Sequence, residues 1–344
     1  MEDVPLKPFC ESIINWLSDS EIRSKQGAVY SWVNPDKPGY IYNEIIGYHI
    51  KLFSYLYKKT KNKKHLRIAT TSADFLSTNL SESGAVSRGN IEYVFDSAIC
   101  MSGIIALSKV TELKQTHKDS LKKLANFVYN SLLKKQIAIE NGKEVTDINK
   151  WSLSYGSLII KTCIGLYESY EFFNDEKYKK MAEQIAKELV QETFKEDHFI
   201  INSQRSWVYT HPHCYATEGL LFMTAKGYDF NEITKKSADW LAENQNKDGS
   251  MYNWYLHEGV ELEKQGDATS QAVRIWCCTD KEKYAENIKN ATTFLKSLQS
   301  EEEGLAYNMD STGNVSRDIN SWVSIFTAQA LLWQIDEPEK SWLI

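Results

Sequence analysis

A short segment recurs along the chain and constrains the fold more than any other feature. In each copy an amphipathic stretch ends in an aromatic residue or leucine, and a polar turn, a glycine and a short hydrophobic stretch follow, as in ADWLAENQNKDGSMY and TTFLKSLQSEEEGLAY. The anchors lie roughly 51 to 62 residues apart, at Trp16, Phe75, Phe127, Leu189, Trp240 and Phe294. A nearly constant period of this length indicates a repeat architecture.

Each copy is followed by a second, strongly apolar segment, such as AICMSGIIAL or SLIIKTCIGLY. We expect helices at residues 42–59, 93–110, 153–173, 213–226, 268–278 and 320–334. A helix that is apolar nearly all round is buried on both sides, whereas a lysine-rich helix such as DEKYKKMAEQIAKELV faces solvent on one side. Six hairpins, each with a solvent-facing outer helix and a buried inner helix, predict an all-α (α/α)6 toroid that forms one domain over residues 1–344.

The loops of this predicted toroid contain glycines and little strand pattern. Gly27, Gly84, Gly249 and Gly304 follow outer helices, where a left-handed helix cap favours glycine. No alternating pattern is long enough for a large sheet, although short β pieces are expected in loops such as GAVYSWV.

Charge and composition exclude several functions. A net charge of −6 provides no strong basic field for nucleic acid. No apolar stretch reaches about 18 residues, so we expect no membrane span. The acidic N-terminus lacks the pattern of a secretion signal. The six cysteines are scattered without a CxxC pair, which indicates free thiols, no structural zinc and a cytoplasmic location. Nothing in the sequence calls for a cofactor.

In a toroid, the N-terminal ends of the inner helices surround one end of a central funnel. Each predicted helix start carries an aromatic residue, an ionisable residue or both. The candidate catalytic residues are Glu44, Asp96, His211, His213, Glu218 and Asp267. The candidate binding residues are Tyr42, Arg88, Trp151, Arg205, Trp207, Gln271, Arg274 and Trp322. Aromatic planes with polar groups suit polyhydroxylated sugar rings, and arginines suit a carboxylate or sulfate on such a ring.

Each charged candidate also has a structural interpretation. Asp96 and Asp267 precede apolar helices and could cap them. Glu44 could be exposed. Glu218 lies inside an apolar helix, where a carboxylate needs a function or a salt partner. Arg274 needs a buried anion, which could be a protein carboxylate or a substrate.

The segment THPHCYATEG concentrates histidines, a cysteine and a carboxylate. Pro212 places it at the first turn of a helix. The spacing from His213 to Glu218 is one residue off the i, i+4 spacing of two metal ligands on one helix face, so we expect no metal site. His211 and His213 could cap the helix, form core hydrogen bonds, or act as general acid and base in the funnel.

The hairpin repeat and the funnel residues resemble the six-hairpin glycosidase superfamily, which includes unsaturated glucuronyl hydrolases and, more distantly, N-acylglucosamine 2-epimerases and toroidal lyase domains. In the hydrolases, an aspartate at an inner-helix start acts as general acid/base, and Asp96 in YVFDSA matches it best. In the epimerases, inner-helix histidines move the proton, which implies His211 or His213. The turn also resembles the repeats of squalene-cyclase-type toroids, but the DxDD acid motif of those proteins is missing.

The sequence therefore favours a carbohydrate-active enzyme, foremost a glycoside hydrolase that uses carboxylates on a glycan, possibly one that contains uronate. In one version, Asp96 protonates the leaving oxygen while Glu218 or Asp267 activates water. The alternatives are a sugar epimerase or polysaccharide lyase that uses a histidine and a tyrosine, a glycan-binding toroid without catalysis, and a terpene-cyclase-like protein.

Overall fold

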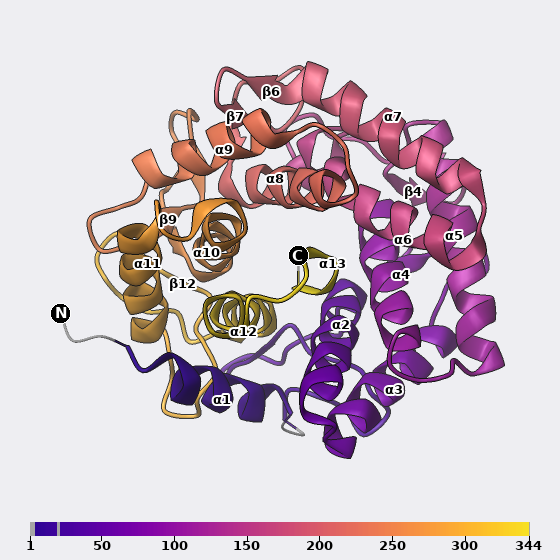
Figure 1. The fold of residues 1–344 in the computed structure, drawn as a ribbon, viewed down its shortest axis with the longest axis horizontal. Coiled ribbons are helices and arrows are strands. Elements are labelled where there is room, and N and C mark those ends of the chain that lie inside the picture. The colour runs from indigo at the N-terminus through magenta and orange to yellow at the C-terminus, as the bar shows by residue number, and fades with distance from the viewer. Residues whose placement is uncertain (1–3, 19–20, 344) are drawn as a thin grey trace.

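Six helical hairpins form a closed ring in the computed structural model, which describes residues 4–18 and 21–343 (Figure 1). The outer helices are α1 (Leu6–Leu17), α3 (Lys63–Thr78), α5 (Gln115–Leu133), α7 (Glu176–Thr193), α9 (Asn231–Glu243) and α11 (Ala285–Ser297). The inner helices are α2 (Asn43–Thr60), α4 (Val94–Ser108), α6 (Cys163–Phe173), α8 (Thr210–Ala225), α10 (Gly266–Asp280) and α12 (Ser321–Asp336). The predicted all-α (α/α)6 toroid is confirmed.

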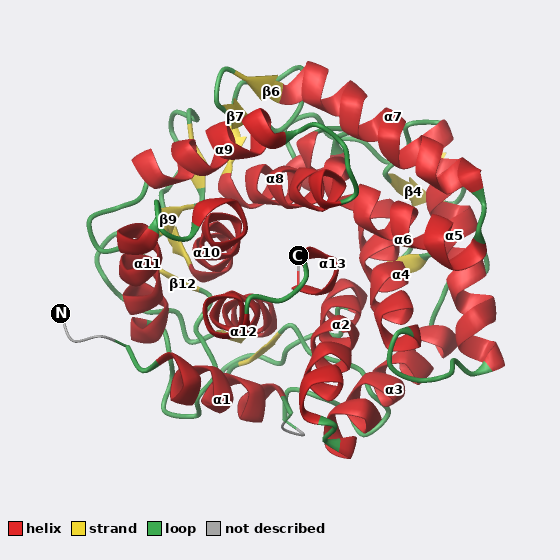
Figure 2. Ribbon diagram, in the orientation of Figure 1, coloured by secondary structure: helices red, strands yellow, loops and turns green. Residues whose placement is uncertain are grey.

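Each inner helix packs on the next one, and α12 closes the ring against α2 (Figure 2). The third inner segment differs from expectation, because it begins with a 3-10 helix, η2 (Ser157–Thr162), before α6. Helix α8 begins three residues earlier than predicted. Pro212 fits inside its first turn because the first N–H groups of a helix have no intrahelical partner.

Small residues allow the inner helices to approach closely. A Cβ atom on Gly47 of α2 would lie 2.8 Å from the Cα atom of Cys100 in α4, and a Cβ on Gly103 of α4 would lie 3.0 Å from the Cα of Gly47. The contact therefore requires glycine on both helices. This tight pairing explains why the inner segments mix small and large apolar residues without a polar face.

The repeat glycines do not cap the outer helices, which corrects the sequence prediction. Helix α9 ends at Glu243, and Gly249 lies in a later turn with a φ of 90°. A Cβ there would overlap the carbonyl oxygen of Asn290 in the next outer helix. Gly27 and Gly84 also have positive φ angles, whereas Gly304 does not. The glycine is needed because the turn packs directly on the neighbouring repeat.

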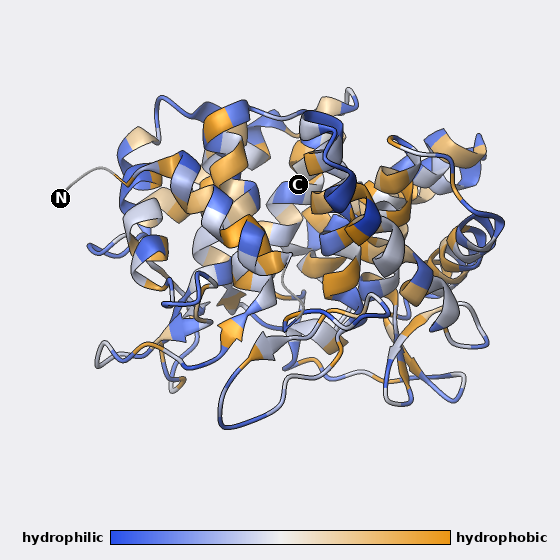
Figure 3. Cartoon of the chain, turned by 90° about the horizontal axis from the view of Figure 1, so that it is seen from below, coloured by the Kyte–Doolittle hydropathy of each residue, from blue (hydrophilic) through white to orange (hydrophobic). Residues whose placement is uncertain are grey.

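Short strands and loops gather at one end of the ring (Figure 3). The strands β1 (Trp32–Val33) and β13 (Ile319–Asn320) pair and join the first repeat to the last. The others are β2 (Val86–Arg88), β3 (Ile91–Tyr93), β4 (Ala138–Glu140), β5 (Lys143–Glu144), β6 (Phe194–Lys195), β7 (His198–Phe199), β8 (Val208–Tyr209), β9 (Met251–Tyr252), β10 (Trp254–Tyr255), β11 (Lys264–Gln265) and β12 (Asn308–Met309). The sheet orders are β2-β3-β4-β5, β12-β11-β9, β10-β8 and β6-β7. A 3-10 turn, η1 (Trp151–Leu153), completes this end.

A short last helix, α13 (Lys340–Leu343), lies within the ring in the axial view and contacts α2 and α8 (Figure 1). The buried Trp342 lies against Tyr55, and the ammonium groups of Lys58 and Lys109 lie over its indole ring. Tyr55 and Lys58 belong to the C-terminal part of α2, so the indole ring packs far from the strand-rich end.

In the described part of the chain, no helix combines the length and the apolar character needed to cross a bilayer.

Candidate active site

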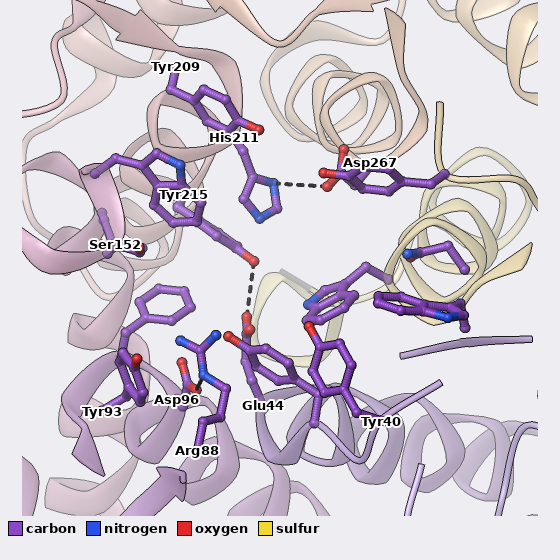
Figure 4. A pocket seen from close by; sticks show the side chains of 18 of the residues that line it. Tyr40, Glu44, Arg88, Tyr93, Asp96, Ser152, Tyr209, His211, Tyr215 and Asp267 are labelled. Carbon is purple, nitrogen blue, oxygen red and sulfur yellow. Dashed lines mark hydrogen bonds and ion pairs between the residues drawn. The ribbon is translucent and has the colours of Figure 1, made fainter. Parts of the chain in front are cut away.

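A cavity of about 320 Å³ opens among the N-terminal ends of the inner helices. The residues that line it are Trp32, Tyr40, Tyr42, Glu44, Arg88, Tyr93, Phe95, Asp96, Ile137, Trp151, Ser152, Leu158, Tyr209, His211, Tyr215, Asp267, Tyr307, Asp318, Asn320 and Trp322. Side chains from distant repeats converge here because the ring brings the starts of the six inner segments to one place (Figure 4). The volume lies within the range of small-ligand sites.

One wall holds an arginine between two tyrosine rings. The Arg88 guanidinium lies 4.3 Å from the centre of the Tyr42 ring and 3.9 Å from that of Tyr93. Its Nε is 3.5 Å from Oδ2 of Asp96. That distance and geometry make an ion pair without a hydrogen bond, and Oδ2 of Asp96 has no hydrogen-bond partner among the described residues. This oxygen is therefore a buried acceptor that lacks a hydrogen-bond donor among those residues.

Glu44 completes this wall and forms a carboxyl pair with Asp96. Oε1 of Glu44 accepts a hydrogen bond of 3.2 Å from the hydroxyl of Tyr215. Burial and the negative charge of Asp96 raise the pKa of Glu44 to about 8, although Arg88 opposes the shift. Burial also raises the pKa of Asp96 to about 6 against the effect of Arg88. Near neutral pH the pair therefore holds about one proton.

The facing wall carries a histidine beside an aspartate (Figure 4). Nδ1 of His211 is 2.5 Å from Oε1 of Gln271 and 3.8 Å from Oδ2 of Asp267. Burial lowers the pKa of His211, although the charge of Asp267 opposes the shift. Burial raises the pKa of Asp267 against the effect of His211. The imidazole therefore projects into the cavity in its neutral form, which can accept a proton.

Aromatic rings surround both sets of polar groups. Tyr42 packs edge-on against Trp322, with ring centres 4.6 Å apart, and Tyr40 packs on Trp32 at 5.0 Å. Across the cavity, Trp151 stacks on Tyr209 at 5.4 Å. Flat apolar rings beside hydrogen-bonding groups suit a ligand with both an apolar face and polar edges.

Below the cavity, the interior of the ring is filled by paired charges. Glu218 is fully buried, and its carboxylate accepts hydrogen bonds from Arg274, from Lys161 at 2.8 Å and from Gln271 at 3.2 Å. Burial alone would raise the pKa of Glu218, but the charges of Arg274 and Lys161 outweigh burial and hold the pKa below its ordinary value. Glu218 is therefore ionised.

A second buried set continues towards Trp342. The Nζ of Lys51 donates a 3.0 Å hydrogen bond to Ser102, whose hydroxyl donates to Glu168 at 2.5 Å. Lys109 forms an ion pair of 2.9 Å with the same carboxylate. Burial would raise the pKa of Glu168, but the two lysines hold it below its ordinary value. A sequence of polar layers thus extends along the axis below the cavity.

The structure brings together part of the predicted site and separates the rest. The candidates that line the cavity are Tyr42, Glu44, Arg88, Asp96, Trp151, His211, Asp267 and Trp322. The candidates outside its lining are Arg205, Trp207, His213, Glu218, Gln271 and Arg274. Of the alternatives considered for Glu218 and Arg274, the geometry favours the internal one, because each is the other's buried partner.

Three of the residues outside the lining have other partners. His213 is fully buried, and its Nδ1 accepts a hydrogen bond of 3.0 Å from the N–H of Phe199, which is the core role considered for it. Arg205 donates to the side chain of Asn149 at 2.8 Å. Trp207 stacks on the His257 ring with 3.8 Å between ring centres. Neither Arg205 nor Trp207 lines the cavity.

Sequence reasoning missed several lining residues. Tyr215 lies four residues after His211 on α8, so the helical period places both on one face, and this signal was available. Tyr209 and Tyr307 lie in the strand-rich segments before α8 and α12, where no pattern marked them. Trp32 belongs to β1 and reaches the cavity because that strand pairs with β13 beside α12.

Among the residues that the structure describes, no three histidine, cysteine, aspartate or glutamate side chains are grouped to hold a metal ion. The six cysteines are all free.

No protein-family model matches the chain, and no curated protein matches its sequence. Solved structures do match. A cellobiose 2-epimerase from Bacillus thermoamylovorans B4167 superposes with a TM-score of 0.76 at 14% identity, covering 96% of this chain and 100% of that one. An unsaturated glucuronyl hydrolase specific for heparin gives 0.73 at 13% identity, with 97% and 98% coverage.

A D-mannose isomerase is similarly close, with a TM-score of 0.74 at 11% identity and 97% coverage of both chains. These similarities extend over almost the whole ring, while the low identities leave the reaction open. The order of the hairpins, the closure of the ring and the superpositions agree with the resemblance found in the sequence. The chain therefore shares the (α/α)6 toroid fold of these three enzymes.

Proposed function

We propose that the chain is a carbohydrate-active enzyme that hydrolyses a glycosidic bond in the cavity. One observation carries the proposal: proton-donating and proton-accepting groups lie on facing walls between aromatic rings (Figure 4). The Glu44–Asp96 pair, which retains a proton near neutral pH, is the acid. Neutral His211 beside Asp267 is the base. Similar folds in an epimerase, a hydrolase and an isomerase that act on sugars support a sugar as substrate.

In this reaction, the carboxyl pair gives its proton to the leaving oxygen as the bond from that oxygen to the anomeric carbon breaks. Water adds to the same carbon and loses a proton to His211. The proton balance closes when the imidazolium returns its proton to solvent and the carboxyl pair takes one up. The aromatic rings bind the apolar face of the sugar.

The charges of the cavity favour a neutral sugar over a uronate. Its lining carries four carboxyl groups, on Glu44, Asp96, Asp267 and Asp318, and the single guanidinium among the described lining residues is that of Arg88. Arg88 already lies beside Asp96. A carboxylate on the substrate would therefore meet more negative than positive charge.

Epimerisation is the second candidate, and the position of His211 favours it. A neutral imidazole that projects into the cavity could remove a proton next to a sugar carbonyl without bond cleavage. Hydrolysis and epimerisation leave different isotopes in the product. Hydrolysis in H₂¹⁸O introduces ¹⁸O into the released sugar, whereas epimerisation in D₂O introduces carbon-bound deuterium.

The test is mass spectrometry of products from neutral and uronate oligosaccharides in both labelled waters. We expect ¹⁸O incorporation from a neutral oligosaccharide that is lost in Glu44→Gln, Asp96→Asn and His211→Gln. Arg205→Ala, outside the cavity, is the matched control and retains activity. Deuterium on carbon without cleavage would replace hydrolysis by epimerisation, and no conversion of any sugar would overturn both.

A further inference from the structure

His211 and His213 lie two residues apart on α8 but have opposite hydrogen-bonding surroundings. Nδ1 of His213 accepts the N–H of Phe199, so its proton is on Nε2, which lies 3.4 Å from the carbonyl oxygen of Ser237. Nδ1 of His211 instead faces the side-chain oxygen of Gln271. An amide oxygen only accepts, so this contact requires a proton on Nδ1 of His211.

The orientation of the Gln271 amide is therefore decisive, and Glu218 determines it. The Nε2 of Gln271 donates to Oε2 of Glu218 at 3.2 Å. A carboxylate that is ionised can only accept. If the amide were flipped, its oxygen would face the carboxylate oxygen in a fully buried site, without a proton between them. Such a pair of unsatisfied acceptors is strongly unfavourable.

Glu218 is held in this state by groups deeper in the ring. Arg274 donates to its Oε1 and Lys161 to its Oε2, and all three side chains are at most 1% exposed. Arg274 also donates to the amide oxygen of Gln329. The anchoring groups thus have fixed partners.

We propose that Glu218, acting through Gln271, holds His211 in the tautomer with the proton on Nδ1, so that Nε2 carries the lone pair in the cavity. Gln271 and Glu218 are positioning residues, and His211 is the group that meets the substrate. The role as base rests on the proposed function, but the tautomer does not. Asp267 lies too far from Nδ1, at 3.8 Å, to replace the hydrogen bond from Gln271.

The test is ¹⁵N NMR of the full chain labelled at histidine, recorded without substrate. We expect His211 to show a protonated Nδ1 and His213, as internal reference, a protonated Nε2. Gln271→Met keeps the side-chain volume but removes the acceptor. We expect it to reduce the ratio of Nδ1–H to Nε2–H tautomer at His211 by at least tenfold and to leave His213 unchanged.

Two further variants make the result decisive. Glu218→Gln can donate to Gln271 and permits the flipped amide, so we expect the same loss of the Nδ1–H tautomer at His211. Asp267→Asn should retain the tautomer. The proposal is overturned if His211 carries its proton on Nε2 in the unmodified protein. It is equally overturned if Gln271→Met keeps the Nδ1–H tautomer, or if only Asp267→Asn loses it.

The activity readout separates this proposal from the proposed function. In Gln271→Met we expect kcat to fall by about tenfold to a hundredfold with KM nearly unchanged, since the base is present but wrongly protonated. The expected tautomers without any sugar conversion would uphold the positioning role and remove the proposed function. Sugar conversion with the opposite tautomer would do the reverse.

Discussion

The carboxyl groups of the cavity wall and those beneath them are similarly buried but differ in protonation. Glu44, Asp96 and Glu218 are all at most 5% exposed. The pKa values of the first two are raised, and that of Glu218 is lowered. Glu218 has two cations to itself, whereas Glu44 and Asp96 share Arg88. The three carboxyl groups therefore differ in the number of their cationic partners and not in their burial. Glu44 and Asp96 can exchange a proton, whereas Glu218 stays ionised and holds the ring together.

We expect the largest effect from a substitution in the ion-paired layer below the cavity. Glu218→Leu leaves Lys161 and Arg274 buried without their anion, so we expect the free energy of unfolding to fall by about 3–5 kcal/mol. Chemical denaturation measures it. The control is Asp36→Ala, which removes an ion pair with Arg317 in which both side chains are 64% exposed. It should change stability by less than about 1 kcal/mol. Equal losses of stability in the two variants would show that the buried charges of Glu218 do not hold the ring together.

A substitution in the carboxyl pair of the cavity wall should change activity and leave stability unchanged. Under the proposed function, Glu44→Gln removes one of the two carboxyl groups that share the catalytic proton, so we expect kcat to fall by about 10² to 10⁴. The denaturation midpoint should not decrease, because the substitution removes a desolvated acid. A variant that unfolds easily, or that retains full activity, would show that Glu44 is structural.

The raised pKa of Glu44 predicts a pH dependence of stability. Between its ordinary value near 4.5 and about 8, the folded state binds more protons than the unfolded chain. The contribution of Glu44 is therefore complete below the ordinary value and is lost as pH rises to about 8. We expect a loss on the order of 3–4 kcal/mol between pH 5 and 8 in the unmodified protein. The loss should be smaller in Glu44→Gln. If the free energy of unfolding depended on pH in the same way in both proteins, the raised pKa of Glu44 would be refuted.

The smallest effect distinguishes two tryptophans that looked alike in sequence. Trp151 lines the cavity, whereas Trp207 stacks on His257 outside it. Loss of one ring from a sugar site costs about 1 kcal/mol. Trp151→Ala should therefore raise KM by about fivefold to tenfold, and Trp207→Ala should leave it unchanged. Steady-state kinetics measures both KM values, and an equal change in the two variants would contradict the distinction.

The fold was predictable because the repeat period, the apolar inner segments and the lysine-rich outer segments agree. The same logic placed Asp96, His211 and Asp267 at helix starts that converge. It could not separate them from Glu218, because the partners of Glu218 come from two other hairpins.

A signal for the deeper layer was nevertheless present. Lys51 in IIGYHIKLFSYLY and Lys161 in SLIIKTCIGLY are single cations inside apolar helices, and each implies a buried anion. The distance between cavity carboxyls and the tilt of each helix depend on packing over the whole ring. No local pattern records either of them.

The filled interior of the ring determines how a long molecule could use the cavity. Below the lining lie Glu218 with its cations, then Lys51 and Glu168, and finally Trp342. Among the described residues, these buried groups fill the ring beneath the cavity. Under the proposed function, a glycan would therefore offer a terminal unit to the cavity, and the released sugar would leave before the next terminus could bind.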